Sequence, residues 1–226
     1  MALPEALAHH ALRVLRLRDG EAVVLFDGSG GEVDARLAVR GKAVFARLGE
    51  ARAVERESPL RIVLVQALAS GDKMDWVVQK AVELGVHAIQ PVQAERSVLR
   101  LAAERADKRV AHWQQVAVAA CEQCGRNRVP VVHDVLALDD WLRARPATRA
   151  GLVPDPAAPA GIGALPPPAG PLDLLIGPEG GLSADEVARA ARAGMTPVRL
   201  GPRILRAETA ARAALAAVNS LGGDFR

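Results

Sequence analysis

The sequence predicts an α/β fold with a parallel sheet, preceded by a small domain of β-strands. After residue 60, short apolar segments alternate with longer segments of helical periodicity, the order typical of a parallel sheet covered by helices. Before residue 60, short alternating segments are separated by glycine-containing turns, which favours antiparallel strands. The charged segment 51–60, which contains Ser58-Pro59, indicates a link between the two. We therefore expect one domain at 1–59 and a second at 60–226.

The first domain is expected to begin with a helix, or a turn-interrupted helical segment, over 2–17. Strands are predicted at 21–26, 33–39 and 42–48, forming an antiparallel meander. The glycine-rich stretch Asp27-Gly-Ser-Gly-Gly31 lies between the first two strands, and no helical segment follows it. Because a phosphate-binding loop opens into a helix, this stretch is interpreted as a hairpin turn.

The second domain is expected to alternate strands and helices. We predict strands at 62–67, 87–92, 129–133 and 151–153, and helices at 72–84, 102–123 and 138–145. In the first of these helices, Trp76 lies between Lys73 and Lys80 on the polar face. This face is either solvated, with a partly buried tryptophan, or a contact for nucleic acid. The proline-rich segment 154–171 is expected to be a loop beside the functional site or a flexible segment.

Two strand–turn–helix units near the end of the chain carry the most informative motifs. The apolar run Leu172–Ile176 is typical of a buried parallel strand, and Gly177-Pro-Glu-Gly-Gly181 follows it. Ser183 and Glu186 then have the spacing of a capping box, which begins a helix.

The second unit comprises a strand at 198–200, the turn Gly201-Pro202 and an alanine-rich helix from about Arg206. Two such loops can face one ligand. The apolar side chains around them favour a ligand with an aromatic or adenine-like body, and the glycines let it approach the backbone.

Several other classes of site are disfavoured by the motifs that the sequence lacks. Neither Gly-x-Gly-x-x-Gly nor Gly-x-x-x-x-Gly-Lys-Ser/Thr occurs, which argues against dinucleotide and nucleoside triphosphate cofactors. There is no Gly-x-Ser-x-Gly, the five histidines are scattered, and Cys121-x-x-Cys124 has no second cysteine pair. We therefore expect neither a hydrolytic triad nor a metal site.

The charge and hydropathy of the chain give weaker indications. The net charge is +3 and arginine supplies most of the cations, which favours an RNA or DNA partner because the guanidinium group suits phosphates and bases. A genomic base-composition bias would explain the same arginine content equally well. No apolar run approaches the roughly 20 residues that span a bilayer, and the N-terminus lacks the layout of a signal peptide. A cytoplasmic location is expected.

Two motifs together closely resemble the 16S rRNA (uracil-1498-N3)-methyltransferase family, RsmE type, of the SPOUT superfamily. They are Leu175-Ile-Gly-Pro-Glu-Gly-Gly-Leu182 and Leu200-Gly-Pro-Arg-Ile-Leu-Arg-Ala-Glu-Thr-Ala210. Further similar stretches are His10-x-x-Arg13-Val-Leu-Arg16-Leu, Lys80-Ala-Val-Glu-Leu-Gly85, Glu95-Arg-Ser97 and Glu122-Gln-Cys-Gly-Arg-Asn-Arg128, so the resemblance covers the whole chain. Cys124 departs from the serine common in the family, and Cys-x-x-Cys is therefore interpreted as incidental.

This resemblance implies a SPOUT-type parallel sheet with a C-terminal deep trefoil knot that binds S-adenosylmethionine, preceded by a PUA-like β-barrel that helps to hold RNA. It also implies a homodimer packed through the knotted domain, acting on 16S rRNA or the small ribosomal subunit, without a membrane or a metal. One stripe of the last helix fits close approach of a partner helix or ordinary core packing equally well. It consists of Ala207, Ala210, Ala211, Ala214 and Val218.

The resemblance also implies roles for particular residues. Cofactor binding is expected at Ile176, Gly177, Pro178, Glu179, Gly180, Gly181, Leu200, Gly201, Ile204, Leu205, Arg206, Thr209 and Ala210. Because methylation at uracil N3 requires loss of a proton, a base or a cation must lie nearby, and the catalytic candidates are Arg126, Arg206 and Glu208. RNA contacts are expected from Arg13, Arg16, Lys73, Lys80, Arg96, Arg126 and Arg128. The alternatives are a SPOUT methyltransferase acting on a ribose 2′-hydroxyl or on guanine, and a non-catalytic RNA-binding factor for ribosome assembly.

Overall fold

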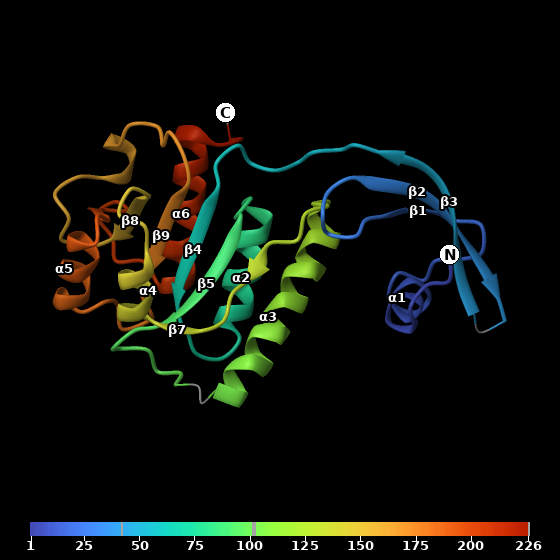
Figure 1. Ribbon diagram of the computed structural model, residues 1–226, viewed down its shortest axis with the longest axis horizontal. Helices are drawn as coiled ribbons and strands as arrows, with labels where there is room; N and C mark the ends of the chain where they lie inside the picture. Colours follow the sequence, from blue (N-terminus) through green and yellow to red (C-terminus); the bar gives the residue numbers. More distant parts are fainter. Residues whose placement is uncertain (42, 101–102, 226) are drawn as a thin grey trace. The chain divides into compact units, whose positions relative to one another are not determined.

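A computed structural model describes residues 1–41, 43–100 and 103–225 (Figure 1). The chain divides into two compact units. Unit 1 contains Met1–Arg56 together with Arg126–Val129, and unit 2 contains Glu57–Gly125 and Pro130–Arg226. The division falls close to the link expected from the sequence, but the segment 126–129 joins the first unit although it lies far along the chain.

Unit 1 begins with a short helix, α1 (Glu5–His9), which continues as one π-helical segment, His10–Val14, within the helical or turn-interrupted segment expected over 2–17. The strands β1 (Ala22–Leu25), β2 (Glu32–Arg40) and β3 (Ala43–Arg52) form an antiparallel sheet in that order. Strand β3 pairs in addition with the N-terminal segment, through an antiparallel bridge between Ala2 and Phe45 and a hydrogen bond from Leu3 N–H to the Val44 carbonyl at 2.9 Å. Closure of these strands into the expected barrel stays a prediction. Residue 42, the expected start of the third strand, lies outside the described residues.

The segment 126–129 belongs to unit 1 because the glycine-rich turn after β1 binds it. Gly30 N–H donates to the Asn127 carbonyl at 3.1 Å, and Val129 N–H donates to the Gly28 carbonyl at 3.0 Å. Gly30 has a φ of +109°, a conformation that residues with a Cβ rarely adopt, so this turn favours glycine. The stretch is therefore a turn, as the sequence indicated, and it also docks a distant part of the chain.

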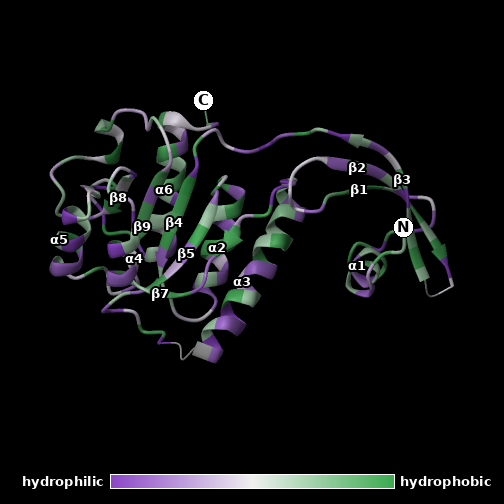
Figure 2. Cartoon of the chain, viewed as in Figure 1, coloured by the Kyte–Doolittle hydropathy of each residue, from purple (hydrophilic) through white to green (hydrophobic). Residues whose placement is uncertain are grey.

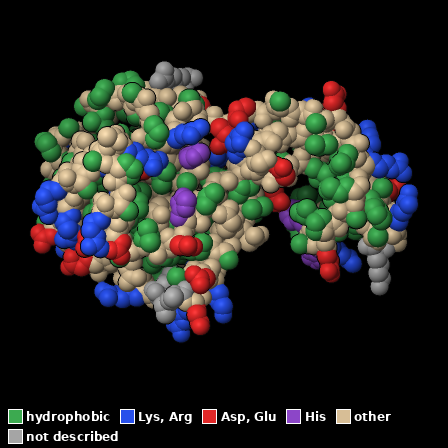
Figure 3. Space-filling view, viewed as in Figure 1, with side chains coloured by type: hydrophobic (Ala, Val, Ile, Leu, Met, Phe, Trp, Pro, Cys, Tyr) green, Lys and Arg blue, Asp and Glu red, His purple; other side chains and the backbone are tan. Residues whose placement is uncertain are grey.

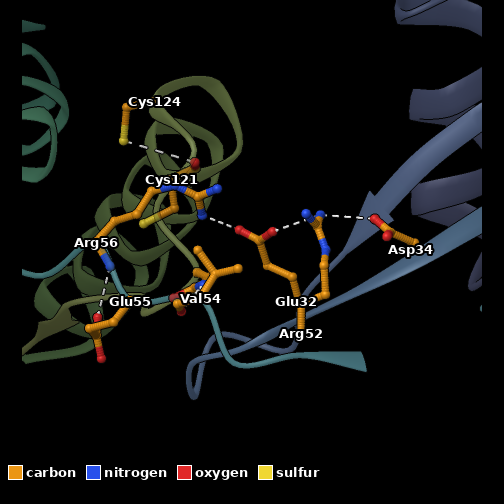
Figure 4. Close-up of polar contacts among 9 residues, drawn as sticks. Glu32, Asp34, Arg52, Val54, Glu55, Arg56, Cys121 and Cys124 are labelled. Atoms are coloured by element: carbon orange, nitrogen blue, oxygen red, sulfur yellow. Dashed lines mark hydrogen bonds and ion pairs between the residues drawn. The ribbon is translucent and has the colours of Figure 1, made fainter. Parts of the chain in front are cut away.

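A charged cluster lies at the end of the same sheet where β2 begins and β3 ends (Figure 4). The buried carboxylate of Glu32 pairs with Arg52 at 3.2 Å and with Arg56, and Arg52 also reaches Asp34 at 2.8 Å. The hydrogen bond from Arg56 holds the pKa of Glu32 below its ordinary value.

Unit 2 is a parallel sheet in the order β10-β8-β9-β4-β5-β6, with β7 also paired to β5. Its strands are β4 (Ile62–Ala67), β5 (Ala88–Gln93), β6 (Val131–Val132), β7 (Leu136–Ala137), β8 (Ala150–Pro154), β9 (Leu172–Ile176) and β10 (Thr196–Val198). Its helices are α2 (Lys73–Glu83), α3 (Ala103–Cys124), α4 (Leu138–Ala144), α5 (Ala184–Arg192) and α6 (Ala207–Gly222), with a 3₁₀ turn at Ile162–Ala164. The parallel α/β fold agrees with the sequence prediction. The helix start expected at residue 102 lies outside the described residues.

Strand β9 lies at the centre of the sheet, between β4 and β8, and every one of its residues is buried. Leu175 packs with α4 and α5 in one hydrophobic cluster, which also contains Val65 of β4 and Trp141 of α4. Because side chains alternate along a strand, Leu174 points to the opposite face. Figure 2 shows β4 as largely hydrophobic, whereas α3 mixes hydrophobic and hydrophilic residues along its length.

The strand expected at 198–200 lies two residues earlier, at Thr196–Val198. Strand β10 ends at Val198, opposite Pro154 of β8. The next residue, Arg199, instead exchanges backbone hydrogen bonds with the proline-rich segment: it donates to the Ala160 carbonyl and accepts from Ile162 N–H. The segment 154–171 is therefore partly ordered by backbone pairing, and Leu200 lies in a loop.

The small-residue stripe of α6 is explained by packing within the chain. Ala207, Ala211, Ala214 and Val218 are at most 6 % exposed, whereas Ala210 is partly exposed. The stripe therefore faces the core, and it no longer argues for contact with a partner helix.

In the described part of the chain, no helix is both long and apolar enough to cross a membrane.

An ion cluster fixes the amino half of β9. The carboxylate of Asp173 is 3 % exposed and binds Arg145 Nε at 2.9 Å and Arg149 Nε at 3.1 Å. Arg145 also donates to the carbonyls of Ala193 and Arg149, so its guanidinium joins β8, β9 and the end of α5. Burial raises the pKa of Asp173, although both guanidinium groups oppose that shift.

We predict that Asp173→Asn lowers the free energy of unfolding by about 3–5 kcal/mol, because the Arg145 cation would stay buried without its counter-ion. The matched control is Asp140→Asn, which breaks the exposed pair with Arg143 and should cost about 0–1 kcal/mol. Urea unfolding of both variants measures the difference. Equal losses would show that the buried cluster is no more important than a surface pair.

Candidate cofactor-binding site

A cavity of about 330 Å³ lies where β8 and β9 end. Its walls come from the loop after β8, the loop after β9, the segment between β10 and α6, and the first turns of α6. The lining residues are Pro154, Asp155, Pro156, Ile176, Gly177, Pro178, Glu179, Gly180, Gly181, Leu182, Val187, Leu200, Gly201, Arg203, Ile204, Leu205, Ala207 and Ala210. Ligands of open parallel sheets bind at the carboxyl ends of the strands, and this cavity has that position.

The loop after β9 has a shape that only its sequence allows. A Cβ on Gly177 would lie 2.9 Å from the backbone nitrogen of Leu182, and Gly181 has a φ of +69°. Ser183 then caps α5: its hydroxyl accepts from Glu186 N–H, while the Glu186 side chain accepts from Ser183 N–H. The other Glu186 oxygen accepts from Glu95 N–H at 2.8 Å, which ties this loop to the one after β5.

Eleven of the thirteen residues expected to bind cofactor line this cavity. The two others, Arg206 and Thr209, do not line it; both are exposed near the start of α6. The lining residues that were not among the expected cofactor contacts include Pro154, Asp155, Pro156, Leu182, Val187 and Arg203, although the segment 154–171 was expected to be a loop beside the site or flexible. The first three follow a predicted strand directly, so the rule that ligands bind at carboxyl ends of strands would have found them.

Gly180 has a second role that the sequence did not reveal. Arg96 donates to its carbonyl at 3.2 Å, and a Cβ on Gly180 would lie 3.2 Å from the Arg96 Cβ. The close approach that requires a small residue here is therefore made by Arg96 of the same chain.

Glu179 is the best-held acidic side chain in the cavity wall. Its Oε1 accepts hydrogen bonds from Ser70 Oγ at 2.6 Å, Lys73 Nζ at 2.9 Å and Ser70 N–H at 3.0 Å. Burial alone raises the pKa of Glu179, but these three donors outweigh it and lower the pKa to about 2. The carboxylate is therefore ionised at neutral pH.

The three catalytic candidates belong to two different units of the chain. Arg206 is the exposed residue that precedes α6, and Glu208 is partly buried in its first turn. Among the described residues, the Oε2 atom of Glu208 is buried and has no hydrogen-bond partner. Arg126 belongs to unit 1 and is 5 % exposed.

Most of the cations expected to bind RNA already have partners within the chain. Lys73 binds Glu179, Lys80 binds Glu83 at 2.8 Å, and Arg96 binds Gly180. Arg128 binds Glu55 at 3.2 Å and the Ser29 carbonyl. Arg126 is only 5 % exposed. The expectation that these side chains serve mainly as free phosphate ligands is therefore weakened.

Arg13 and Arg16 differ from the other cations expected to bind RNA because both side chains are exposed. Arg16 also has a φ of +56°, an uncommon conformation for a residue other than glycine. On the face drawn in Figure 3, the Lys and Arg side chains are dispersed among acidic and hydrophobic groups.

No cluster of three or more His, Cys, Asp or Glu suited to a metal occurs in the part of the chain that the structure describes.

The chain matches two family models. An RNA methyltransferase domain matches residues 56–219, and an RNA methyltransferase PUA domain matches residues 3–48. Among curated relatives, the ribosomal RNA small subunit methyltransferase E of Bacillus subtilis is 34 % identical, over 93 % of this chain and 86 % of that protein. The protein of the same name from Mycobacterium bovis is 36 % identical, over 94 % of this chain and 83 % of its own length.

Two solved structures are similar over nearly the whole chain. A ribosomal RNA small subunit methyltransferase E from Neisseria gonorrhoeae, bound to S-adenosyl methionine, has a TM-score of 0.92 and 42 % identity, covering 100 % of this chain and 93 % of that one. A methyltransferase from Legionella pneumophila in complex with the same cofactor has a TM-score of 0.93 and 38 % identity, covering 99 % and 93 %. With both domain models matched and relatives similar over most of their length, the chain belongs to the ribosomal RNA small subunit methyltransferase E family.

Proposed function

We propose that this protein transfers a methyl group from S-adenosylmethionine to N3 of uridine 1498 in 16S ribosomal RNA. The observation that carries the proposal is the cavity at the ends of β8 and β9, lined by the two motifs that resemble the family. Relatives similar over the whole chain were crystallised with this cofactor. A ribosomal RNA substrate implies that the reaction takes place in the cytoplasm.

The residues present fit such a cofactor. Ile176, Leu200 and Leu205 give the cavity apolar walls suited to an adenine ring, and the Glu179 carboxylate supplies an acceptor in the same wall. The sulfonium group of the cofactor supplies a methyl group that is already activated, so the reaction requires no metal.

At the substrate, the N3–H bond of uracil must break as the new N–CH₃ bond forms. We assign proton acceptance to Glu208, because this carboxylate lies in the first turn of α6, where Ala207 and Ala210 line the cavity. Arg206, two residues before it, is an exposed cation that stabilises negative charge developing on the uracil ring. The proton passes to Glu208 and then to water, while bound S-adenosylmethionine would supply the methyl group and become a neutral thioether.

The proposed architecture includes the trefoil knot, in which the end of the chain threads through an earlier loop. It is supported by the position of the segment between β10 and α6, which shares the cavity with the loops after β8 and β9. Helix α6 then packs against β9 and α2. True knots are rare, so this part of the proposal relies on the family resemblance more than on general topology.

We also propose a homodimer, formed through unit 2. It is supported by large apolar side chains that are exposed in the single chain, in particular Trp76 at 57 % and Ile204 at 86 %. Ile204 lies at the cavity and Trp76 stacks beneath Arg212 of α6, so a second copy would cover apolar surface close to the proposed site.

For cofactor binding, we predict that Ala210→Phe fills the cavity and removes the increase in melting temperature that saturating S-adenosylmethionine gives the parent protein. Ser220→Phe, at an exposed position of the same helix, is the control and should keep the full increase. Thermal-shift measurements and calorimetry test both variants. A folded Ala210→Phe protein with the parent affinity would place the cofactor elsewhere.

For the chemistry, we predict that Glu208→Gln and Arg206→Gln each slow single-turnover methyl transfer by about a hundredfold or more, with cofactor affinity nearly unchanged. Arg192→Gln, an exposed arginine of α5, should have no effect. EDTA should not inhibit the parent. Base-resolved mass spectrometry of the product would contradict the assignment if the methyl group were found on ribose or guanine, and absence of any transfer would favour a non-catalytic binding protein.

For RNA binding, we predict that Arg13→Gln and Arg16→Gln each weaken affinity and reduce the slope of log affinity against log salt by about one unit, because each removes one phosphate contact. Arg47→Gln changes an exposed arginine of the same unit outside the predicted set, and its slope should stay at the parent value. Filter binding across a salt series gives these slopes. If neither substitution changes the slope, unit 1 does not grip the RNA backbone through these residues.

A further inference from the structure

A second cavity, of about 580 Å³, lies at the opposite edge of the sheet of unit 2, where β4, β5, β8 and β9 begin. Each lining residue is the first residue of one of these strands or lies within the three residues before it. They are Arg61, His87, Thr148, Arg149, Ala150, Ala169, Gly170 and Pro171. Strands of five or six residues span about 15–20 Å, so this cavity is separate from the cofactor cavity at their carboxyl ends.

Backbone pairing places Arg61 and Arg149 on either side of β9. Leu172 N–H donates to the Arg61 carbonyl at 3.0 Å, and Ala150, which follows Arg149, is the register partner of Leu172 on the other side. Neighbouring strands lie about 4.8 Å apart, so these two backbones are about 10 Å apart and two arginine side chains can reach one ligand between them. The segment 169–171 that leads into β9 is Ala-Gly-Pro, whose short side chains leave this space open.

The charges around this cavity are unbalanced. No acidic residue is among its described lining residues. Arg149 reaches Asp173 through Nε alone, at 3.1 Å, and its side chain is 29 % exposed, while the same carboxylate also binds Arg145. The exposed side chain of Arg61 has no ion pair or hydrogen bond within the residues that the structure describes. Three guanidinium groups therefore share one carboxylate, and an anion in the cavity would balance the excess.

The donors favour an anion with several oxygen atoms. Each guanidinium group presents a planar fork of N–H donors, which suits phosphate geometry. The hydroxyl of Thr148 is a further donor in the lining, and the ring of His87 carries at least one N–H in either protonation state. A carboxylate has only two oxygens to accept from these four side chains, whereas a phosphate group has more.

We propose that this cavity binds a phosphate group, held between Arg61 and Arg149 with Thr148 and His87 donating to its remaining oxygens. The phosphate belongs either to the backbone of bound RNA or to a small phosphorylated molecule. No residue of the cofactor cavity takes part, so the inference does not depend on the proposed methyl transfer.

Calorimetry with inorganic phosphate on the full chain, without RNA and at constant ionic strength in chloride, tests the site. Arg61→Gln should weaken phosphate binding by about tenfold or more, the effect of losing a charge-assisted hydrogen bond. Arg61→Lys should have a smaller effect, because it keeps the charge without the fork. Arg192→Gln, an exposed arginine of α5, is the control and should keep the parent affinity.

Thr148→Ala gives a second test that leaves the ion pairs of Asp173 intact, and it should weaken phosphate binding by about two- to tenfold. The affinity for S-adenosylmethionine should equal that of the parent in both Arg61→Gln and Thr148→Ala. If Arg61→Gln loses cofactor affinity as well, the substitution disturbs the fold, and Thr148→Ala then decides the question.

Filter binding of a 16S rRNA transcript across a salt series distinguishes the two sources of phosphate. If the phosphate belongs to RNA, Arg61→Gln weakens RNA binding and reduces the slope of log affinity against log salt by about one unit, and inorganic phosphate competes with RNA in the parent. Thr148→Ala then lowers the affinity without changing the slope. If the phosphate belongs to a small molecule, Arg61→Gln loses phosphate binding and keeps the RNA affinity and slope of the parent.

The inference is overturned if folded Arg61→Gln binds both inorganic phosphate and RNA as the parent does, or if Arg192→Gln loses as much phosphate affinity as Arg61→Gln. A parent protein that binds phosphate through Arg61 but does not bind S-adenosylmethionine would refute the proposed function and leave this site standing.

Discussion

The rest of unit 2 depends on the complete burial of β9 between two parallel neighbours. A strand of five buried residues has no solvent-facing side, so its chain must leave the sheet abruptly where the apolar run ends at Ile176. Gly177-Pro178 makes that exit, and the neighbouring strand β8 ends at the same edge. The cavity exists because two loops turn away from adjacent strands there, and the segment that precedes α6 closes its remaining side.

Ionic contacts hold the chain at both ends of β9, and they have different consequences. Asp173 sits near the beginning of the strand and is fully used by Arg145 and Arg149, which makes it a structural group. Glu179 follows the end of the strand and is used on one oxygen only. The fold thus uses both oxygens of Asp173 in ion pairs, whereas only one oxygen of Glu179 is paired, to Ser70 and Lys73.

The basic residues illustrate how far sequence reasoning extends. Lys73, Lys80 and Arg128 belong to stretches that resemble an RNA-binding family, yet each pairs with an acidic side chain or a carbonyl of its own chain. A single sequence shows that a cation is present, but its partner can lie a hundred residues away, as Glu179 does from Lys73. The same limit applies to the alanine stripe of α6, whose spacing fits a partner helix and a core equally well, and which the fold buries.

What the sequence determined by itself was local. Hydrophobic periodicity and glycine turns predicted the parallel α/β sheet, the buried strand Leu172–Ile176 and the Ser183 cap, because each depends on residues close together in the chain. The family resemblance of two local motifs implied most of the cavity lining. The tertiary structure alone decided that β10 ends at Val198, that 126–129 packs with the glycine turn of unit 1, and that Ser70 and Lys73 bind Glu179. These features arise from hydrogen bonds between distant segments, and they form only once the sheet has fixed which segments meet.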